Sequence, residues 1–174
     1  MQKNNIVLIG FMASGKTAVA GILSNQLKMP FTDTDMLIEN QQHMKISEIF
    51  RKKGEQFFRK KETEILGKLL FVNNFIISTG GGITQKKENR VILKKLGKVF
   101  FLKTDVEDIL QRLKKEKKYK RPLINNSKDI KKTIETLLKK RQKSYKSCAK
   151  FVIDTSGLDK LNVAGKIIKK IGKK

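Results

Sequence analysis

The sequence has few of the residues that build disulfide frameworks and zinc sites. Its 174 residues include one cysteine, Cys148, and one histidine, His43. One cysteine cannot form an internal disulfide, and one histidine without a neighbouring cysteine or second histidine does not make a zinc site. We therefore expect Cys148 to be a packing residue of a helix in a reducing compartment, His43 to lie at the surface, and no transition metal to be bound.

Long hydrophobic segments are missing as well. The longest apolar run, residues 6–13, is far shorter than the roughly 18 residues that span a membrane, and no signal-peptide cleavage site follows it. With 174 residues and 39% hydrophobic content, the chain can bury one core. We expect a single domain of residues 1–174, located in the cytoplasm and without a membrane partner.

Acidic residues are scarce relative to basic ones. Lysine and arginine number 40 against 16 aspartates and glutamates, which gives a net charge of +24. Such an excess is typical of proteins that bind nucleic acids or anionic membranes. Here the lysines are spread from Lys52 to Lys174, no tryptophan is present, and no aromatic residues interleave with them to stack on bases. We interpret the charge as a solvated surface that attracts anionic nucleotides, and we expect no specific nucleic acid partner.

Residues 10–17, Gly-Phe-Met-Ala-Ser-Gly-Lys-Thr, follow an apolar strand at residues 6–9 and precede a helical pattern. This spacing and context predict a phosphate-binding loop, or P-loop. Its glycines let backbone N–H groups turn inward, the helix adds its positive N-terminal dipole, Lys16 reaches the outer phosphates and Thr17 can ligate magnesium. The sequence therefore predicts a nucleoside triphosphate site, and an ordinary glycine-containing turn is the alternative.

Two carboxylates, Asp33 and Asp35, follow the next expected strand near residues 31–32. At the carboxyl end of a strand in an open α/β sheet they would face the ligand crevice. There they can hold magnesium-bound water and orient an acceptor hydroxyl. Because Asp and Thr also favour helix caps, capping of the helix expected at residues 36–42 is the alternative.

The middle of the chain holds an arginine and three glycines whose role the pattern leaves open. Residues 46–70 predict two helices separated at Gly54, and Arg59 on the second is either a solvated charge or a functional one. A buried-type strand at residues 75–78 leads into a triple glycine at residues 80–82. Successive glycines suggest that a ligand approaches the backbone closely, and a flexible loop is the alternative.

Helices and strands alternate along the rest of the chain. We expect helices at residues 89–96, 106–113 and 128–149, strands at 99–102 and 151–154, and a closing C-terminal helix. This alternation implies a parallel, three-layer α/β fold. Residues 114–123 have little apolar periodicity, and Arg121-Pro122 places a phosphate-reading side chain among them, which suits a lid that closes over ATP. A solvated run of charges is the alternative.

The ordered set of motifs resembles the shikimate kinase family over nearly the whole chain. The set comprises the P-loop, Asp33-Thr34-Asp35, the Gly-Glu-Gln-Phe-Phe-Arg run of residues 54–59, the triple glycine, Arg121-Pro122-Leu123, and Arg141 before Tyr145. The resemblance implies a P-loop kinase fold of the nucleoside-monophosphate-kinase type with a five-stranded parallel sheet, acceptor-binding helices at about residues 34–60 and a lid at about residues 114–126. It further implies ATP-dependent phosphorylation of the 3-hydroxyl of shikimate, giving shikimate 3-phosphate and ADP, in the shikimate pathway of aromatic amino acid biosynthesis.

The resemblance also assigns roles to residues by matched position. ATP would be bound by Gly10, Ala13, Ser14, Gly15, Lys16, Thr17, Ala18, Arg112 over the adenine, and Arg121 at the transferred phosphoryl group; Thr17 and Asp33 would serve Mg²⁺. Shikimate would be bound by Asp35 at its hydroxyls, Arg59 and Arg141 at its carboxylate, Gly80, Gly81, Gly82, and an apolar wall of Phe50 and Phe58. Lys16, Asp35 and Arg121 would be the catalytic residues, in a chain that acts as a monomer.

Two positions depart from the family pattern. Ala13 stands where the family usually has a glycine, so this position must tolerate a Cβ atom. After residues 153–155 the family often has a proline against the adenine, whereas this chain has Ser156-Gly157-Leu158. We therefore expect the P-loop backbone and the adenine contacts to differ in detail from the family pattern.

Two other functions share parts of the sequence pattern. Another small-metabolite kinase, such as a gluconate or adenylylsulfate kinase, would share the P-loop but need an acceptor pocket different from the one that Asp35, Arg59 and the triple glycine offer. A non-catalytic nucleotide- or nucleic-acid-binding module would instead use the basic surface, and it predicts tight DNA or RNA binding with a steep salt dependence.

Overall fold

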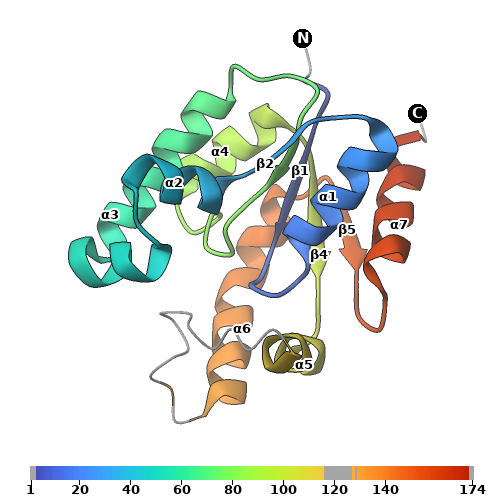
Figure 1. Ribbon diagram of the computed structural model, residues 1–174. Helices are drawn as coiled ribbons and strands as arrows, with labels where there is room; N and C mark the ends of the chain where they lie inside the picture. The colour runs from blue at the N-terminus through green and yellow to red at the C-terminus, as the bar shows by residue number, and fades with distance from the viewer. Residues whose placement is uncertain (1–2, 116–126, 128, 173–174) are drawn as a thin grey trace.

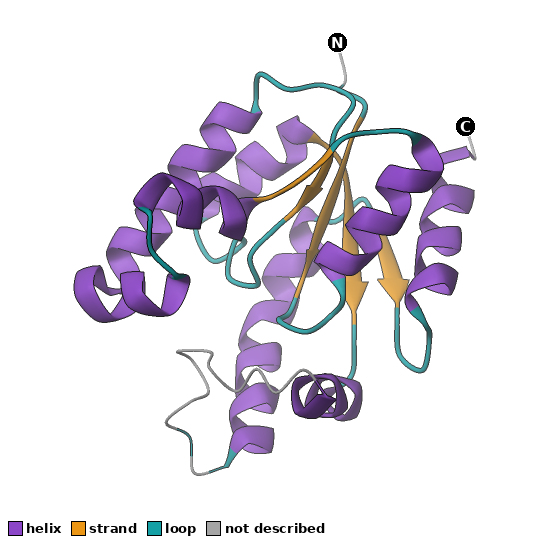
Figure 2. Ribbon diagram, viewed as in Figure 1, coloured by secondary structure: helices purple, strands orange, loops and turns teal. Residues whose placement is uncertain are grey.

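A five-stranded parallel sheet forms the centre of the structure, a computed structural model that describes residues 3–115, 127 and 129–172. Its strands are β1 (Asn5–Gly10), β2 (Phe31–Asp33), β3 (Ile76–Ser78), β4 (Gly97–Lys103) and β5 (Phe151–Asp154). They lie in the order β2-β3-β1-β4-β5, and each neighbouring pair is parallel (Figure 2). The expected five-stranded parallel sheet is confirmed. Arg121 and residues 116–126 of the expected lid lie outside the described residues.

Helices cover both faces of this sheet. They are α1 (Lys16–Leu27), α2 (Thr34–Gln42), α3 (Ile46–Leu69), α4 (Lys87–Leu96), α5 (Val106–Lys115), α6 (Ile130–Cys148) and α7 (Lys160–Gly172). In Figure 1, α1 and α7 lie on one side of the strands, and α3 and α4 on the other. No helix in the described part of the chain is both long and apolar enough to cross a membrane.

Alternation along the strands supplies the apolar contacts for both layers. Ile6 and Leu8 of β1 pack with α1 and α7, whereas Val7 and Ile9 pack with α3, α4 and α6. Successive side chains of a strand point to opposite faces, so one fully buried strand contributes to two cores. Cys148 is buried in the second of these clusters, as expected of a packing residue.

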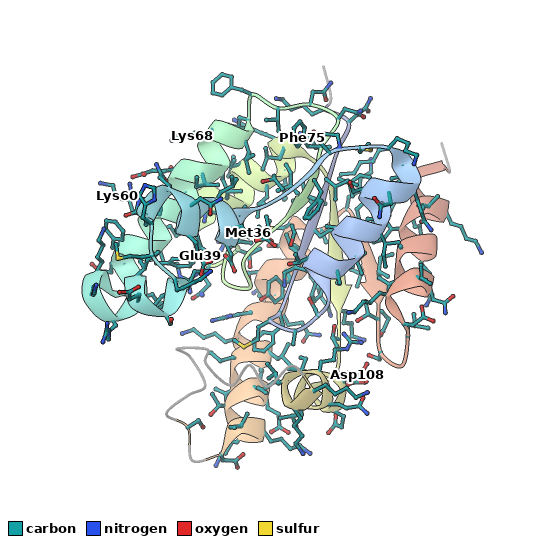
Figure 3. The ribbon with its side chains drawn as sticks, viewed as in Figure 1. Met36, Glu39, Lys60, Lys68, Phe75 and Asp108 are labelled. Carbon is teal, nitrogen blue, oxygen red and sulfur yellow. The ribbon has the colours of Figure 1, made fainter. Side chains whose placement is uncertain are left out.

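A break divides α3 at the position that the sequence predicted. Gly54 has φ of 80° and ψ of 168°, a conformation that is accessible to glycine and strained for other residues. The N–H of Ile46 at the start of α3 is accepted by Glu39 of α2 at 2.9 Å; Glu39 is labelled in Figure 3. The hydrogen bond fastens α2 to the first half of α3, and the break at Gly54 lets the second half run in another direction.

The parallel arrangement brings three loops to the same edge of the sheet. Leu8 of β1 and Asp33 of β2 are both in register with Ser78 of β3. The P-loop after β1, the acidic segment after β2 and the triple glycine after β3 therefore leave the sheet side by side. Ligands of open parallel sheets bind beyond the carboxyl ends of the strands, so this edge is the first place to look for a site.

Candidate active site

The P-loop wraps around the side chain of its own lysine. Lys16 is buried, and its Nζ donates hydrogen bonds to the carbonyl oxygens of Gly10 at 3.0 Å and Phe11 at 2.8 Å. Gly15, with φ of 89°, precedes the first residue of α1, and Ala13 adopts φ of 58°. The structure therefore accommodates the Cβ of Ala13 in a left-handed conformation. Since the N–H groups in the first turn of α1 face the loop, the arrangement is suited to binding phosphate.

Thr17, Asp33 and Ser78 bring three oxygen atoms together beside the P-loop. Thr17 Oγ1 donates to Asp33 Oδ2 at 2.7 Å, and Ser78 Oγ lies 3.3 Å from the same hydroxyl. The other carboxylate oxygen of Asp33 accepts the N–H of Asp35 at 2.9 Å and so caps α2. Asp33 thus caps α2 with one oxygen, as one of the two alternatives expected, while its other oxygen faces Thr17 beside the P-loop.

This oxygen cluster fits the chemistry of Mg²⁺. Mg²⁺ in phosphoryl-transfer sites uses one or two protein oxygens and completes its shell with water and phosphate. Among the described residues no group of three or more His, Cys, Asp and Glu side chains could hold a metal ion. A hydroxyl and a carboxylate next to a P-loop are therefore suited to a metal that arrives with a nucleotide.

The triple glycine lies against charged side chains on both sides. A Cβ added to Gly80 would lie 2.4 Å from Asp35 Oδ1, and one added to Gly82 would lie 2.3 Å from Arg59 Nη1. The N–H of Gly80 donates to Thr34 Oγ1 at 3.0 Å, which ties the loop to α2. Close packing of side chains against bare backbone is therefore the reason that this loop has no side chains of its own.

Arg59 is buried and forms two ion pairs. Its Nη1 lies 2.8 Å from Glu62 Oε2 and its Nη2 lies 2.8 Å from Glu55 Oε1. Burial opposes the charge of Arg59, but the two carboxylates outweigh it and raise the guanidinium pKa above its ordinary value. Of the two alternatives for Arg59, the solvated surface charge does not describe this side chain.

Glu62 was not identified from the sequence, although it is fully buried beside Arg59. Burial raises the pKa of its carboxyl group above the usual range, and the charges of Arg59 and Arg141 only partly oppose this. Within the described part of the chain, its Oε1 has no hydrogen-bond partner. One signal was available. Glu62 falls between Phe58 and Leu66 on the apolar face of α3, where burial of a glutamate is costly unless a partner compensates its charge.

Arg141 and Tyr145 approach the triple glycine from α6. Arg141 Nη1 donates to the Gly81 carbonyl at 3.3 Å, and the Tyr145 hydroxyl donates to the same oxygen. Burial raises the pKa of Tyr145 to about 12. Arg141 is buried too, and its Nε has no hydrogen-bond partner among the described residues. A buried cation with an unused N–H group can bind an anion.

The predicted site residues form two adjoining groups. A pocket of about 1020 Å³ is lined by the P-loop together with Thr17, Ala18, Asp33, Asp35, Gly81 and Arg112. Arg59, Arg141, Gly80 and Gly82 adjoin it around the glycine loop, and the rings of Phe50 and Phe58 lie 4.9 Å apart beside Arg59. Arg121 lies outside the described residues. The pocket at the P-loop and the group of buried arginines thus lie next to each other, an arrangement suited to phosphoryl transfer from a nucleotide to an anionic acceptor.

Comparisons with known proteins agree with this geometry. A family model described as shikimate kinase matches residues 12–172. The shikimate kinase of Alkaliphilus oremlandii is 41% identical over 152 residues, covering 87% of this chain and 89% of its own. The structure titled as shikimate kinase from Acinetobacter baumannii in complex with shikimate has a TM-score of 0.91 and 36% identity, covering 97% of this chain and 93% of its own. That of Aquifex aeolicus has a TM-score of 0.79 and 34% identity, covering 96% and 95%.

Proposed function

The chain belongs to the shikimate kinase family, and from this membership we infer that it transfers the terminal phosphoryl group of ATP to the 3-hydroxyl of shikimate. The products are shikimate 3-phosphate and ADP, and the reaction is a step of aromatic amino acid biosynthesis. The fold is the P-loop kinase fold that the resemblance implied. The roles of individual residues below are our proposal.

We propose that Lys16 and the N–H groups at the start of α1 bind the outer phosphates of ATP. Support comes from the buried position of Lys16 and from the inward-facing loop around it. Thr17 and Asp33 would hold Mg²⁺, whose charge offsets that of the transferred phosphoryl group. The catalytic role of Arg121 rests on the resemblance alone, since this residue lies outside the described part of the chain.

On the acceptor side, Asp35 orients the attacking hydroxyl, and Arg59 and Arg141 bind the carboxylate of shikimate. The contact of Gly80 with Asp35 and that of Gly82 with Arg59 support this arrangement, because both charged groups face the same stretch of backbone. Guanidinium groups match a carboxylate with paired hydrogen bonds. Phe50 and Phe58 would pack against the ring of the substrate.

One observation supports this acceptor assignment most strongly. The guanidinium groups of Arg59 and Arg141 and the carboxylate of Glu62 are buried together against the triple glycine. Glu55, which also pairs with Arg59, is half exposed, and Arg141 Nε has no hydrogen-bond partner among the described residues, so this buried cluster can accept a further anion. A small carboxylic acid such as shikimate supplies that anion, whereas adenylylsulfate carries no carboxylate. Gluconate also carries a carboxylate, so the acceptor assay below is what separates it from shikimate.

We propose that the monomer is the active unit. The lone cysteine, Cys148, is free and buried, in keeping with the expected cytoplasmic location. Sedimentation or size-exclusion chromatography with light scattering would test the oligomeric state.

The experiment that tests the proposed function is an ADP-release assay with a panel of acceptors. We expect rapid ADP release with shikimate, its loss on chelation of Mg²⁺ by EDTA, and its recovery on adding Mg²⁺ back. Gluconate and adenylylsulfate should give no release above the rate without acceptor. Release with one of these acceptors but not with shikimate would overturn the proposal, and so would a product phosphorylated at another hydroxyl.

A further inference from the structure

The turn after β5 is held by hydrogen bonds rather than by proline. Thr155 and Leu158 of this turn line the pocket beside the P-loop. Within the turn, the N–H of Leu158 donates to the Thr155 carbonyl at 3.2 Å, and Gly157 adopts φ of 66°. A proline would fix φ covalently, but residues 155–158 contain none, so their shape depends on contacts with other elements.

Thr104 and the Lys103 carbonyl contact Thr155 at the start of the turn, and Asp108 of α5 contacts its Gly157 end. Asp108 Oδ2 accepts the N–H of Gly157 at 2.9 Å and Nη2 of Arg112 at 3.2 Å. In Figure 3, Asp108 lies on the side of α5 that faces this turn. Arg112 reaches onward, donating to the carbonyl oxygens of Thr155 at 3.3 Å and Ala13 at 3.4 Å. One carboxylate therefore links α5 and the turn directly, and the P-loop through Arg112.

The Asp108 contacts hold Arg112 in the wall of the pocket before any ligand is bound. Only about a quarter of the Arg112 side chain is exposed, at 26%, and 21% of the Asp108 side chain. A guanidinium that is already oriented loses little rotamer freedom when a ligand binds, and its flat face can stack on a heteroaromatic ring. Loss of the carboxylate would remove the ion pair of Arg112 and the hydrogen bond to Gly157, and so loosen both the arginine and the turn.

We propose that Asp108 is a positioning residue for the nucleotide base: it orients Arg112 and fixes the 155–158 turn, so that the base enters a preformed slot between them. The proposal rests on the proposed function for the presence of a nucleotide in this pocket. It assigns Asp108 no contact with the reacting atoms, so it predicts an effect on nucleotide affinity and not on the chemical step.

The test compares Asp108→Asn and Asp108→Ala with Glu107→Gln. Glu107 is a matched control, because it also lies in the first turn of α5 but is exposed and, among the described residues, forms an ion pair with Lys131 at the surface. Calorimetric titration with ADP measures nucleotide affinity without any acceptor. We expect the Kd for ADP and the KM for ATP to rise about three- to tenfold in Asp108→Ala, and less in Asp108→Asn, whose carbonyl oxygen can accept both hydrogen bonds but lacks the negative charge that pairs with Arg112.

The same variants separate positioning from a general loss of structure. If Asp108 is a positioning residue, kcat and the KM for shikimate stay within about twofold of the native values in its variants. Glu107→Gln should match the native chain in kcat, in the KM for shikimate and in nucleotide affinity. An ADP affinity within about twofold of native in both Asp108 variants overturns the proposal, as does an equal decline in kcat and in both KM values. If the native chain binds ADP but does not phosphorylate shikimate, the proposed function fails while the ADP titrations still decide the role of Asp108.

Discussion

Gly82 shows at the scale of one residue how the acceptor site is built. A Cβ at this position would lie within 2.6 Å of three atoms of the Arg59 guanidinium. The atoms that would have to move belong to the end of a flexible side chain and not to backbone. A methyl group at Gly82 should therefore be tolerated by the fold but displace Arg59 from its ion pairs.

We predict that Gly82→Ala raises the KM for shikimate at least about tenfold and leaves the Kd for ADP within about twofold of native. Gly165→Ala is the control, because Gly165 lies in α7 with no atom near the added Cβ. Steady-state kinetics and ADP titration measure both effects. An unchanged KM for shikimate in a folded Gly82→Ala protein would contradict the placement of Arg59 at the acceptor.

The buried hydroxyl of Tyr145 should make the free energy of unfolding depend on pH in alkaline solution. Its folded-state pKa is raised to about 12, whereas an unfolded tyrosine titrates near about 10. The unfolded state therefore loses the proton first as the pH rises. The resulting stabilisation is complete below about pH 10 and is lost between about pH 10 and pH 12, by roughly 2 to 3 kcal/mol.

Urea unfolding of the native chain and Tyr145→Phe across this pH range measures the effect of the hydroxyl. Lysine titration contributes equally to both proteins, so the difference between their free energies of unfolding isolates Tyr145. We expect this difference to shrink as the pH rises from about 10 to about 12. A difference that stays constant would show that the tyrosine hydroxyl is not buried against Gly81.

The site residues that were predicted from the sequence differ from Glu62, which was not, in how far their environment depends on distant parts of the chain. The positions of Lys16, Thr17 and the glycines follow from the local geometry of the backbone, so their spacing along the chain is enough to predict them. Glu62 is defined by its ion pair with Arg59, three residues away, and by the charge of the distant Arg141, which lowers its pKa. A glutamate on a helix usually faces water, and only its apolar neighbours on α3 distinguish it.

At the scale of elements, the break in α3 decides where Arg59 points. The segment before Gly54 leads from α2, and the segment after it carries Arg59 and Glu62 towards the sheet. Gly54 has no neighbouring atom near an added Cβ, so only its backbone conformation requires glycine. Its φ of 80° with ψ of 168° falls in a region that is nearly exclusive to glycine.

We predict that Gly54→Ala lowers the free energy of unfolding by about 1 to 3 kcal/mol. The matched control in the same helix is Gly67→Ala, where the backbone is helical and the added Cβ meets nothing. Gly67→Ala should be neutral or stabilising by up to about 1 kcal/mol. Equal effects of the two substitutions in urea unfolding would contradict a required break at Gly54.

Most elements could be predicted because periodicity is local, but their arrangement could not be derived in that way. The expected strand at residues 75–78 is β3, and the break at Gly54 follows from glycine chemistry. The order β2-β3-β1-β4-β5 depends on pairing between segments far apart in the sequence. The alternation of helices and strands predicted a parallel sheet in a three-layer fold, and the resemblance to a family added that the sheet has five strands.

At the scale of the whole molecule, the net charge of +24 affects stability as well as ligand attraction. Like charges repel in the compact state, and salt screens that repulsion. We predict that raising NaCl from about 0.01 M to about 1 M, which shortens the Debye length from about 30 to about 3 Å, raises Tm by several degrees. Thermal unfolding at a series of salt concentrations measures this. A Tm that falls with salt would mean that attractive surface pairs outweigh the repulsion.

In the proposed function, a P-loop phosphate site and an adjoining two-arginine carboxylate site act together on one pair of substrates. The most direct measurement is kcat/KM for shikimate and for its methyl ester, which keeps the ring and hydroxyls but removes the negative charge. Leaving Arg59 and Arg141 without their anion should cost about 2 to 5 kcal/mol, a loss of roughly 30-fold to several thousand-fold in kcat/KM, with the Kd for ADP unchanged. Arg59→Ala and Arg141→Ala should each reduce the preference for the acid. An ester that performs within about threefold of the acid would contradict the account.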